Sequence, residues 1–218
     1  MTGWPRDSAE PAALAAPAAG QRLADVIGRW LSRKPWPLIR GRAVYLRPPR
    51  RWDFDSWRAL RQASRAHLEP WEPAWPEDAF DRRAFRARLR HHALEARRDE
   101  AHALFVFSRK DHALLGGLTL SNIRRGAIQS ASVGYWIGAR HAGQGAMTDA
   151  LSAACGFGLN ELGLHRIEAA CMIENLASRR VLEKAGFRQE GVARAYRQIA
   201  GQWRDHLLFA RMTGDPVP

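Results

Sequence analysis

The stretch that decides the fold reads VGYWIGARHAGQGAM and runs from Val133 to Met147. It begins inside an apolar run, 128–137, that is typical of a β-strand, and it leads into an amphipathic run, 147–162, that is typical of a helix. The loop between them, Arg140–Gly145, has glycines that let the backbone pass close to a ligand, and its N–H groups and the helix N-terminus would form an anion site. Because a strand-to-helix turn also needs glycine for geometry alone, both interpretations stay open at this point.

A second motif, Asn175-Leu176-Ala177-Ser178, follows a predicted strand and opens a predicted helix. Asn175 suits the N-cap position of that helix, although its amide could equally bond a ligand. Ser178 in the first turn could face solvent or donate a proton to a departing group. Taken alone, these residues favour the structural interpretation at both positions.

The rest of the chain alternates between strand and helix patterns, which predicts a mixed α/β domain. Asp53 is expected to cap a helix that carries Phe54, Trp57 and Leu60 on one face. Three successive strand patterns with turn residues between them predict an antiparallel meander. The expected strands are 43–46, 103–108, 114–121, 128–137, 165–172, 187–199 and 203–212, and the later helices are expected over about 77–98, 147–162 and 176–185.

Composition limits the classes of protein that the chain can represent. Of 218 residues, 46% are hydrophobic and 26% are charged, which is ordinary for a globular protein. No apolar run approaches the ~20 residues needed to cross a bilayer, and the N-terminus lacks the pattern of a secretory signal. Cys155 and Cys171 lack CxxC spacing, so reduced thiols are favoured over a disulfide or a zinc site. We therefore expect a cytoplasmic protein without a metal.

The net charge of +12 rests mainly on arginine, since lysine occurs only at positions 34, 110 and 184. A basic surface favours anionic partners such as nucleic acid, ribosomal RNA or a phosphorylated cofactor. An arginine-rich surface can also serve solubility alone. Charge therefore leaves the partner open.

Residues 1–40 differ in composition from the rest of the chain. The Ala- and Pro-rich segment 1–20 is expected to be disordered. Apolar residues at helical spacing over 23–31 predict a short amphipathic helix, which could touch a membrane or a partner but is expected to pack on its own domain. We expect an N-terminal extension over 1–40, one domain over 41–213 and a tail over 214–218.

Several motifs in order carry a family resemblance over about 41–212. They resemble those of the GCN5-related N-acetyltransferase (GNAT) superfamily, and the stretches 67–73 and 201–206 resemble its ribosomal-protein-alanine N-acetyltransferase branch. The family motifs are Val133–Gly138, Arg140–Gly145, Leu164–Ala169, Glu174–Ser178 and Leu182–Phe187.

The resemblance implies a mostly antiparallel central sheet of six to seven strands, split by a V-shaped cleft, with helices on both faces. It implies a bulge in the strand before the glycine loop, acetyl-CoA as co-substrate and no metal. Ser178 would protonate the departing thiolate, and a backbone N–H near the cofactor arm would stabilise the oxyanion. The cofactor contacts it implies are Trp136, Ile137 and Gly138 for the pantetheine arm, Arg140, Gly143, Gln144, Gly145, Ala146 and Met147 around the pyrophosphate, and Asn175 for the arm.

Two positions depart from the family pattern. Leu182 stands where many relatives have a tyrosine that acts as the thiolate acid, which leaves that role to Ser178. Ser132 stands where related enzymes have a glutamate base. The nearby carboxylates are Glu168, Glu174 and Glu190; Glu168 is expected to serve strand-face electrostatics and Glu190 to order a turn. The sequence therefore names no general base.

The acceptor is the part of the reaction that the motifs do not specify. The resemblance implies direct attack of a protein N-terminal amine, possibly ribosomal, on the thioester. A small amine, such as an amino acid, polyamine or antibiotic, is the alternative acceptor. A non-catalytic RNA- or ribosome-binding protein with the same fold is the alternative of another class. The pairs Trp52/Trp57 and Trp71/Trp75 could line an acceptor pocket, although core packing is the default for tryptophan.

Overall fold

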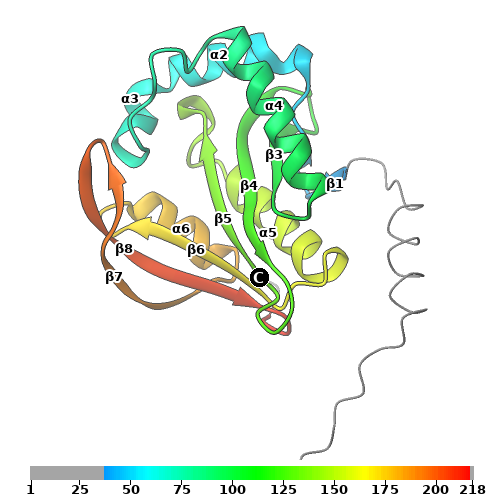
Figure 1. The fold of residues 1–218 in the computed structure, drawn as a ribbon, viewed down its shortest axis with the longest axis vertical. Helices are drawn as coiled ribbons and strands as arrows, with labels where there is room; N and C mark the ends of the chain where they lie inside the picture. Colours follow the sequence, from blue (N-terminus) through cyan, green and yellow to red (C-terminus); the bar gives the residue numbers. More distant parts are fainter. Residues whose placement is uncertain (1–36, 217–218) are drawn as a thin grey trace, which may run out of the picture. The chain divides into compact units, whose positions relative to one another are not determined.

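The computed structural model describes residues 37–216 (Figure 1). The amphipathic helix predicted over 23–31 lies outside these residues. Within the described part of the chain, no helix is long and apolar enough to cross a membrane.

One eight-stranded sheet forms the centre of the fold, with the order β1-β2-β3-β4-β5-β6-β8-β7. Neighbouring strands are antiparallel except for β5 and β6, which are parallel. The predicted mixed, mostly antiparallel class is confirmed, but the strand count exceeds the expected six to seven because the two-residue β1 pairs with β2 and buries Ile39. The strands are β1 (Ile39–Arg40), β2 (Val44–Arg47), β3 (His102–Ser108), β4 (Leu114–Arg124), β5 (Ser130–Ile137), β6 (Arg166–Met172), β7 (Arg188–Ile199) and β8 (Gln202–Met212).

Helices cover both faces of the sheet, as expected. The helix predicted from about 77 begins only at Arg82, and the helix predicted to 162 ends in a π-helical turn. The α-helices are α2 (Phe54–Ala63), α3 (Arg65–Leu68), α4 (Arg82–Arg97), α5 (Ala146–Gly156) and α6 (Leu176–Lys184). The short helices are η1 (Arg51–Asp53), η2 (Glu69–Trp71), η3 (Ala139–His141) and η4 (Phe157–Glu161).

Asp53 does not cap α2 with its side chain, so that prediction is wrong. The carboxylate instead receives two hydrogen bonds from the Arg47 guanidinium, each 2.7 Å, and one from the Arg50 N–H. Two parallel hydrogen bonds from a charged guanidinium outweigh the bond from a single backbone N–H, so the arginine takes the carboxylate.

Strand alternation produces two separate apolar layers. Leu104 and Val106 of β3 point to the face covered by α5 and α6, whereas Phe105 and Phe107 point to the face covered by α2 and α4. Figure 1 shows α4 in front of β3 and α5 behind the sheet. Each fully buried side chain of this kind contributes about 1.5–3 kcal/mol. The two layers hold β3 and β4 rigidly beside β5.

The sheet splits between β5 and β6, which pair only from Ser130 with Arg166 to Val133 with Ala169. Beyond these pairs the two strands diverge, as Figure 1 shows, and the predicted V-shaped split is confirmed. The register shift lies in β4, between Ser121 and Arg124, and not in β5 as the resemblance implied.

Candidate active site

The glycine loop ends in a helix N-terminus that can hold an anion. Gly143 and Gly145 have positive φ angles of 74° and 80°, which glycine adopts without strain. Gly145 is the N-cap of α5, and the Asp149 N–H is the group that bonds back to its carbonyl (3.0 Å). The N–H groups of the first turn, including that of Thr148, have no partner within the helix. They are available to bind an anion, so the anion cradle stays a prediction.

Asp149 is an acidic residue in this first turn, yet its carboxylate serves another segment. It accepts hydrogen bonds from the N–H groups of Arg42, Ala43 and Val44 at 2.9, 2.7 and 3.1 Å. These donors tie α5 to the turn before β2. The charge of Asp149 is thereby offset, so the helix N-terminus keeps its positive character.

Arg140 and Gln144 close the loop upon itself. The Gln144 amide donates to the Arg140 carbonyl, and the Arg140 Nε donates to the His141 Nε2, both at 2.9 Å. Burial, and secondly the Arg140 charge, lower the pKa of His141, which fits a neutral imidazole that accepts this bond.

The edge of β5 that faces the split carries backbone donors. The Gly138 N–H donates to the Leu115 carbonyl of β4 (2.9 Å). Backbone N–H groups alternate in direction along a strand, so those of Tyr135 and Ile137 point to the opposite edge. That edge is open because β6 pairs with β5 only as far as Val133.

Gly138 and Trp136 have other contacts. The Gly138 carbonyl accepts from the His141 N–H (2.8 Å), and a Cβ at Gly138 would collide with the Leu60 side chain. The Trp136 side chain lies on the α2 and α4 face, where the Arg61 guanidinium sits 4.9 Å from its ring centroid. Gly138 thus shapes the loop. Of the three residues predicted to contact the pantetheine arm, Ile137 is the one whose backbone N–H points to the open edge.

Asn175 and Ser178 lie across the split from β5. The Asn175 Oδ1 accepts from the Ser178 N–H at 3.0 Å, so the N-cap interpretation is confirmed and the amide nitrogen is the group left to face a ligand. The Ser178 hydroxyl bonds the Tyr135 hydroxyl at 2.8 Å. Burial raises the pKa of Tyr135 well above its ordinary value, so the phenol keeps its proton.

Tyr135 is a site residue that the sequence analysis missed. Leu182, the position of the family tyrosine, is only 1% exposed in the core. The helix α6 thus has no tyrosine at the family position. The phenol that contacts Ser178 is that of Tyr135, which lies in β5. Strand alternation is the signal that could have found it, because Val133, Tyr135 and Ile137 share the face on which α6 packs.

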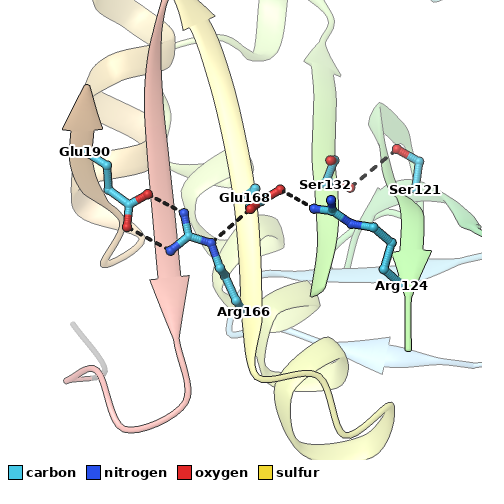
Figure 2. Close-up of polar contacts among 6 residues, drawn as sticks. All are labelled: Ser121, Arg124, Ser132, Arg166, Glu168 and Glu190. Atoms are coloured by element: carbon cyan, nitrogen blue, oxygen red, sulfur yellow. Dashed lines mark hydrogen bonds and ion pairs between the residues drawn. The ribbon is translucent and has the colours of Figure 1, made fainter. Parts of the chain in front are cut away.

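Two of the candidate base carboxylates, Glu168 and Glu190, are held by arginine (Figure 2). Glu168 accepts from Arg124 at 2.9 Å and from Arg166 at 3.0 Å, and Glu190 accepts from Arg166 at 2.8 Å. Arg166 lowers the pKa of Glu190, which lies in β7 and not in a turn, so that prediction is wrong. A carboxylate held charged in this way is a poor proton acceptor.

Glu174 is held in the same manner. Arg204 donates to it at 2.7 Å, and a backbone hydrogen bond, followed by Arg204, lowers its pKa. Ser132 lies on β5 in register with Glu168, and its carbonyl accepts a long bond of 3.5 Å from the Ser121 hydroxyl (Figure 2). None of these three carboxylates is therefore a suitable general base, and the groups that the site offers are hydrogen-bond donors.

The predicted tryptophan pairs separate. Trp57 and Trp75 line a cavity of about 280 Å³ beside Trp136, whereas Trp52 and Trp71 do not line it. Trp52 lies in η1 and is 70% exposed. One member of each pair therefore lies where an acceptor could bind.

Comparisons with known proteins agree with this geometry. Residues 43–188 match the model of the acetyltransferase (GNAT) domain. The chain is 35% identical to the probable N-acetyltransferase YjcK of Bacillus subtilis, over 82% of this chain and 98% of that protein. It is 36% identical to the [ribosomal protein uS5]-alanine N-acetyltransferase of Escherichia coli, over 76% of this chain and 87% of that protein.

A solved structure is also similar to this chain in fold and in sequence. Mycobacterium smegmatis RimJ, in complex with CoA-disulfide, superimposes with a TM-score of 0.75 at 36% identity, covering 82% of this chain and 87% of that chain. The family resemblance carried by the motifs is confirmed. The chain belongs to the acetyltransferase (GNAT) family and is an N-acetyltransferase.

Proposed function

We propose that this enzyme transfers the acetyl group of acetyl-CoA to the N-terminal amine of a protein, with a ribosomal protein as the leading candidate. The observation that carries the proposal is the split between β5 and β6, with the predicted anion cradle at one end and the Tyr135–Ser178 hydroxyl pair at its side. The uS5-alanine N-acetyltransferase supports the choice of a protein N-terminus.

The chain offers contacts for acetyl-CoA along the whole split. The N–H groups of 143–148 would bind the pyrophosphate, and Arg140 would add charge. The outward N–H of Ile137 would bond the pantetheine arm, and the Asn175 amide nitrogen would approach the arm from α6. From the glycine loop, the pantetheine arm would follow β5 toward Val133, where β5 and β6 begin to pair. The thioester would then lie at that point.

The reaction would be a single displacement without an acyl-enzyme. The amine nitrogen forms a bond to the acetyl carbon, the carbon–sulfur bond breaks, and the amine loses a proton to water. The outward backbone N–H of Tyr135 would stabilise the oxyanion. Ser178 would give its proton to the thiolate and recover one from water, while the Tyr135 hydroxyl, which keeps its own proton, would hold the serine hydroxyl in place through their hydrogen bond.

The acceptor would enter over the open face of β5. Gly134 is exposed there, and a Cβ at this position would meet nothing within 4 Å. Its backbone is outside the left-handed region, so neither packing nor conformation requires glycine. A strand glycine of this kind is typical of a place where another backbone approaches closely.

Mass spectrometry of N-terminal peptides and small amines after incubation with acetyl-CoA tests the proposal. Peptide transfer is expected, and transfer to a small amine alone would replace the protein acceptor. Acetyl-CoA at 100 times its Kd should stabilise the fold by about 2.7 kcal/mol, or roughly 5–10 °C in Tm. Salt-sensitive RNA binding without transfer to any amine would point to the non-catalytic alternative.

A further inference from the structure

A cavity lies between α2, α4 and the sheet, on the same face as the proposed acceptor path. Its volume of about 280 Å³ falls below the ~300–1,000 Å³ of pockets for drug-sized ligands, so it suits a side chain. Its walls combine tryptophan and phenylalanine rings with aliphatic side chains. The residues that matter for its chemistry are Trp57, Arg61, Trp75, Arg88, Thr119 and Trp136.

One of the two arginines in the cavity is already neutralised. Arg61 donates two hydrogen bonds to Glu72, at 2.7 and 2.6 Å, and the Trp75 indole N–H donates a third at 2.7 Å. The guanidinium also lies 4.4 Å from the Trp75 ring centroid. The Glu72 carboxylate is therefore paired with Arg61 and Trp75.

Arg88 has no such partner among the residues that the structure describes. Its guanidinium lies 4.9 Å from the Trp57 ring centroid, and its hydrogen bond to the Ala79 carbonyl is long, at 3.4 Å. Among residues 37–216, no carboxylate oxygen lies within 4.0 Å of it, and Asp78 acts only from farther away. Burial, and secondly Arg61, lower the pKa of Arg88. Within the described part of the chain, the cavity thus holds a half-buried positive charge without a counter-ion.

The cavity adjoins the proposed acceptor path. Thr119 lines it, and Thr119 pairs in register with Gly134, the open glycine of β5. Trp136 lies two residues further along the same face of β5. A side chain close to the acceptor amine could therefore reach Arg88 while the amine stays near the split.

We infer that this cavity is a subsite for a carboxylate-bearing side chain of the acceptor, one or two residues after the amine that is acetylated. The inference rests on the proposed function, because it assumes a peptide acceptor. A carboxylate there would pair with Arg88 and remove the cost of leaving its charge without a partner. The aromatic rings of the walls would hold the aliphatic part of the side chain.

Matched peptides provide the test. The probes are Ala-Glu-Gly-Gly and Ala-Gly-Glu-Gly, each with an amidated C-terminus and each compared with its glutamine analogue. For at least one pair, wild-type kcat/KM should be about tenfold or more higher with glutamate, as expected for hydrogen bonds to a charged group. A ratio near one for both pairs, with transfer occurring, would overturn the subsite and leave the proposed function intact.

Two arginines of α4 allow the effect of the Arg88 charge on the Glu/Gln ratio to be separated from the effect of the overall charge of +12. Arg88→Met should bring the Glu/Gln ratio close to one, whereas Arg88→Lys should keep part of it. Arg86→Met removes the same charge at an exposed position of α4 outside the cavity, and should keep the ratio. An equal fall of the ratio in both methionine variants would assign the preference to general electrostatics and overturn the subsite.

Folding is followed independently of turnover. Each variant should keep the rise in Tm that acetyl-CoA produces, which shows that the split is intact. If Arg88→Met does not fold, the wild-type ratio and Arg88→Lys decide the question. No transfer to any peptide, with acetyl-CoA still raising Tm, would overturn the proposed function and the subsite with it.

Discussion

Gly134 permits a prediction in which stability and activity move in opposite directions. A strand glycine costs roughly 0.5–1 kcal/mol relative to alanine, and neither packing nor the backbone angle requires it here. Gly134→Ala should therefore stabilise the fold by about 0.4–1 kcal/mol, mainly by restricting the unfolded chain. For a chain of this size, that raises Tm by roughly 1–4 °C.

The same methyl group would stand in the acceptor path. Forcing extra carbon atoms into a filled space costs typically about 1–3 kcal/mol, which lowers kcat/KM for the acceptor by about 5- to 150-fold. Gly134→Val, with a branched side chain, should lie at the upper end. The Kd of acetyl-CoA should stay close to the wild-type value, because the side chain would point out of the plane of the split.

The assay compares Tm, the acetyl-CoA Kd and kcat/KM in one set of variants. Gly191→Ala is the matched control, since Gly191 also lies in a strand, β7, and a Cβ there also meets nothing within 4 Å. It should leave kcat/KM unchanged. If Gly134→Val acetylated the peptide as efficiently as the wild type, the acceptor could not pass over this face of β5.

Three further predictions concern the proton donor, the glycine loop and the pH profile. Ser178→Ala should lower kcat by about 100-fold, at the low end of general-acid contributions, with little effect on acetyl-CoA affinity; Tyr135→Phe should lower kcat less. Unchanged kcat in the serine variant would remove it as the proton donor. Gly145→Val forces a branched residue to a φ of 80°, at a cost of about 1–3 kcal/mol, and should abolish the acetyl-CoA-induced rise in Tm; a retained rise would take the loop out of the cofactor site. A backbone hydrogen bond, followed by Arg204, lowers the pKa of Glu174, and Arg166 lowers the pKa of Glu190, so both are ionised at neutral pH and the acceptor amine should set the pH profile. Log kcat/KM should rise with unit slope to about pH 7.7–8.0 and then level off, whereas a break near pH 6 would reveal a base in the protein.

Local patterns predict those parts of the site that one short segment builds. The positive φ angles of Gly143 and Gly145, and the capping of α6 by Asn175, follow from residue type and position alone. Strand alternation likewise sets the two faces of β3. In each case the competing conformations differ within a few residues, so the sequence decides between them.

Contacts between distant segments are the part that local patterns miss. Tyr135 and Ser178 meet only because α6 packs under β5, and the free charge of Arg88 depends on Arg61 having taken Glu72. Asp53 shows the same competition, since a capping pattern is overridden by an arginine that arrives from β2. Side-chain partners of this kind follow from the tertiary packing and are not visible along the chain.

A crystal structure of the enzyme with coenzyme A tests the central claim most directly. The account predicts the pyrophosphate on the N–H groups of 143–148, the arm along the open edge of β5, and the sulfur within hydrogen-bonding reach of the Ser178 hydroxyl. Coenzyme A bound away from the split, or a sulfur atom pointing away from Ser178, would contradict it.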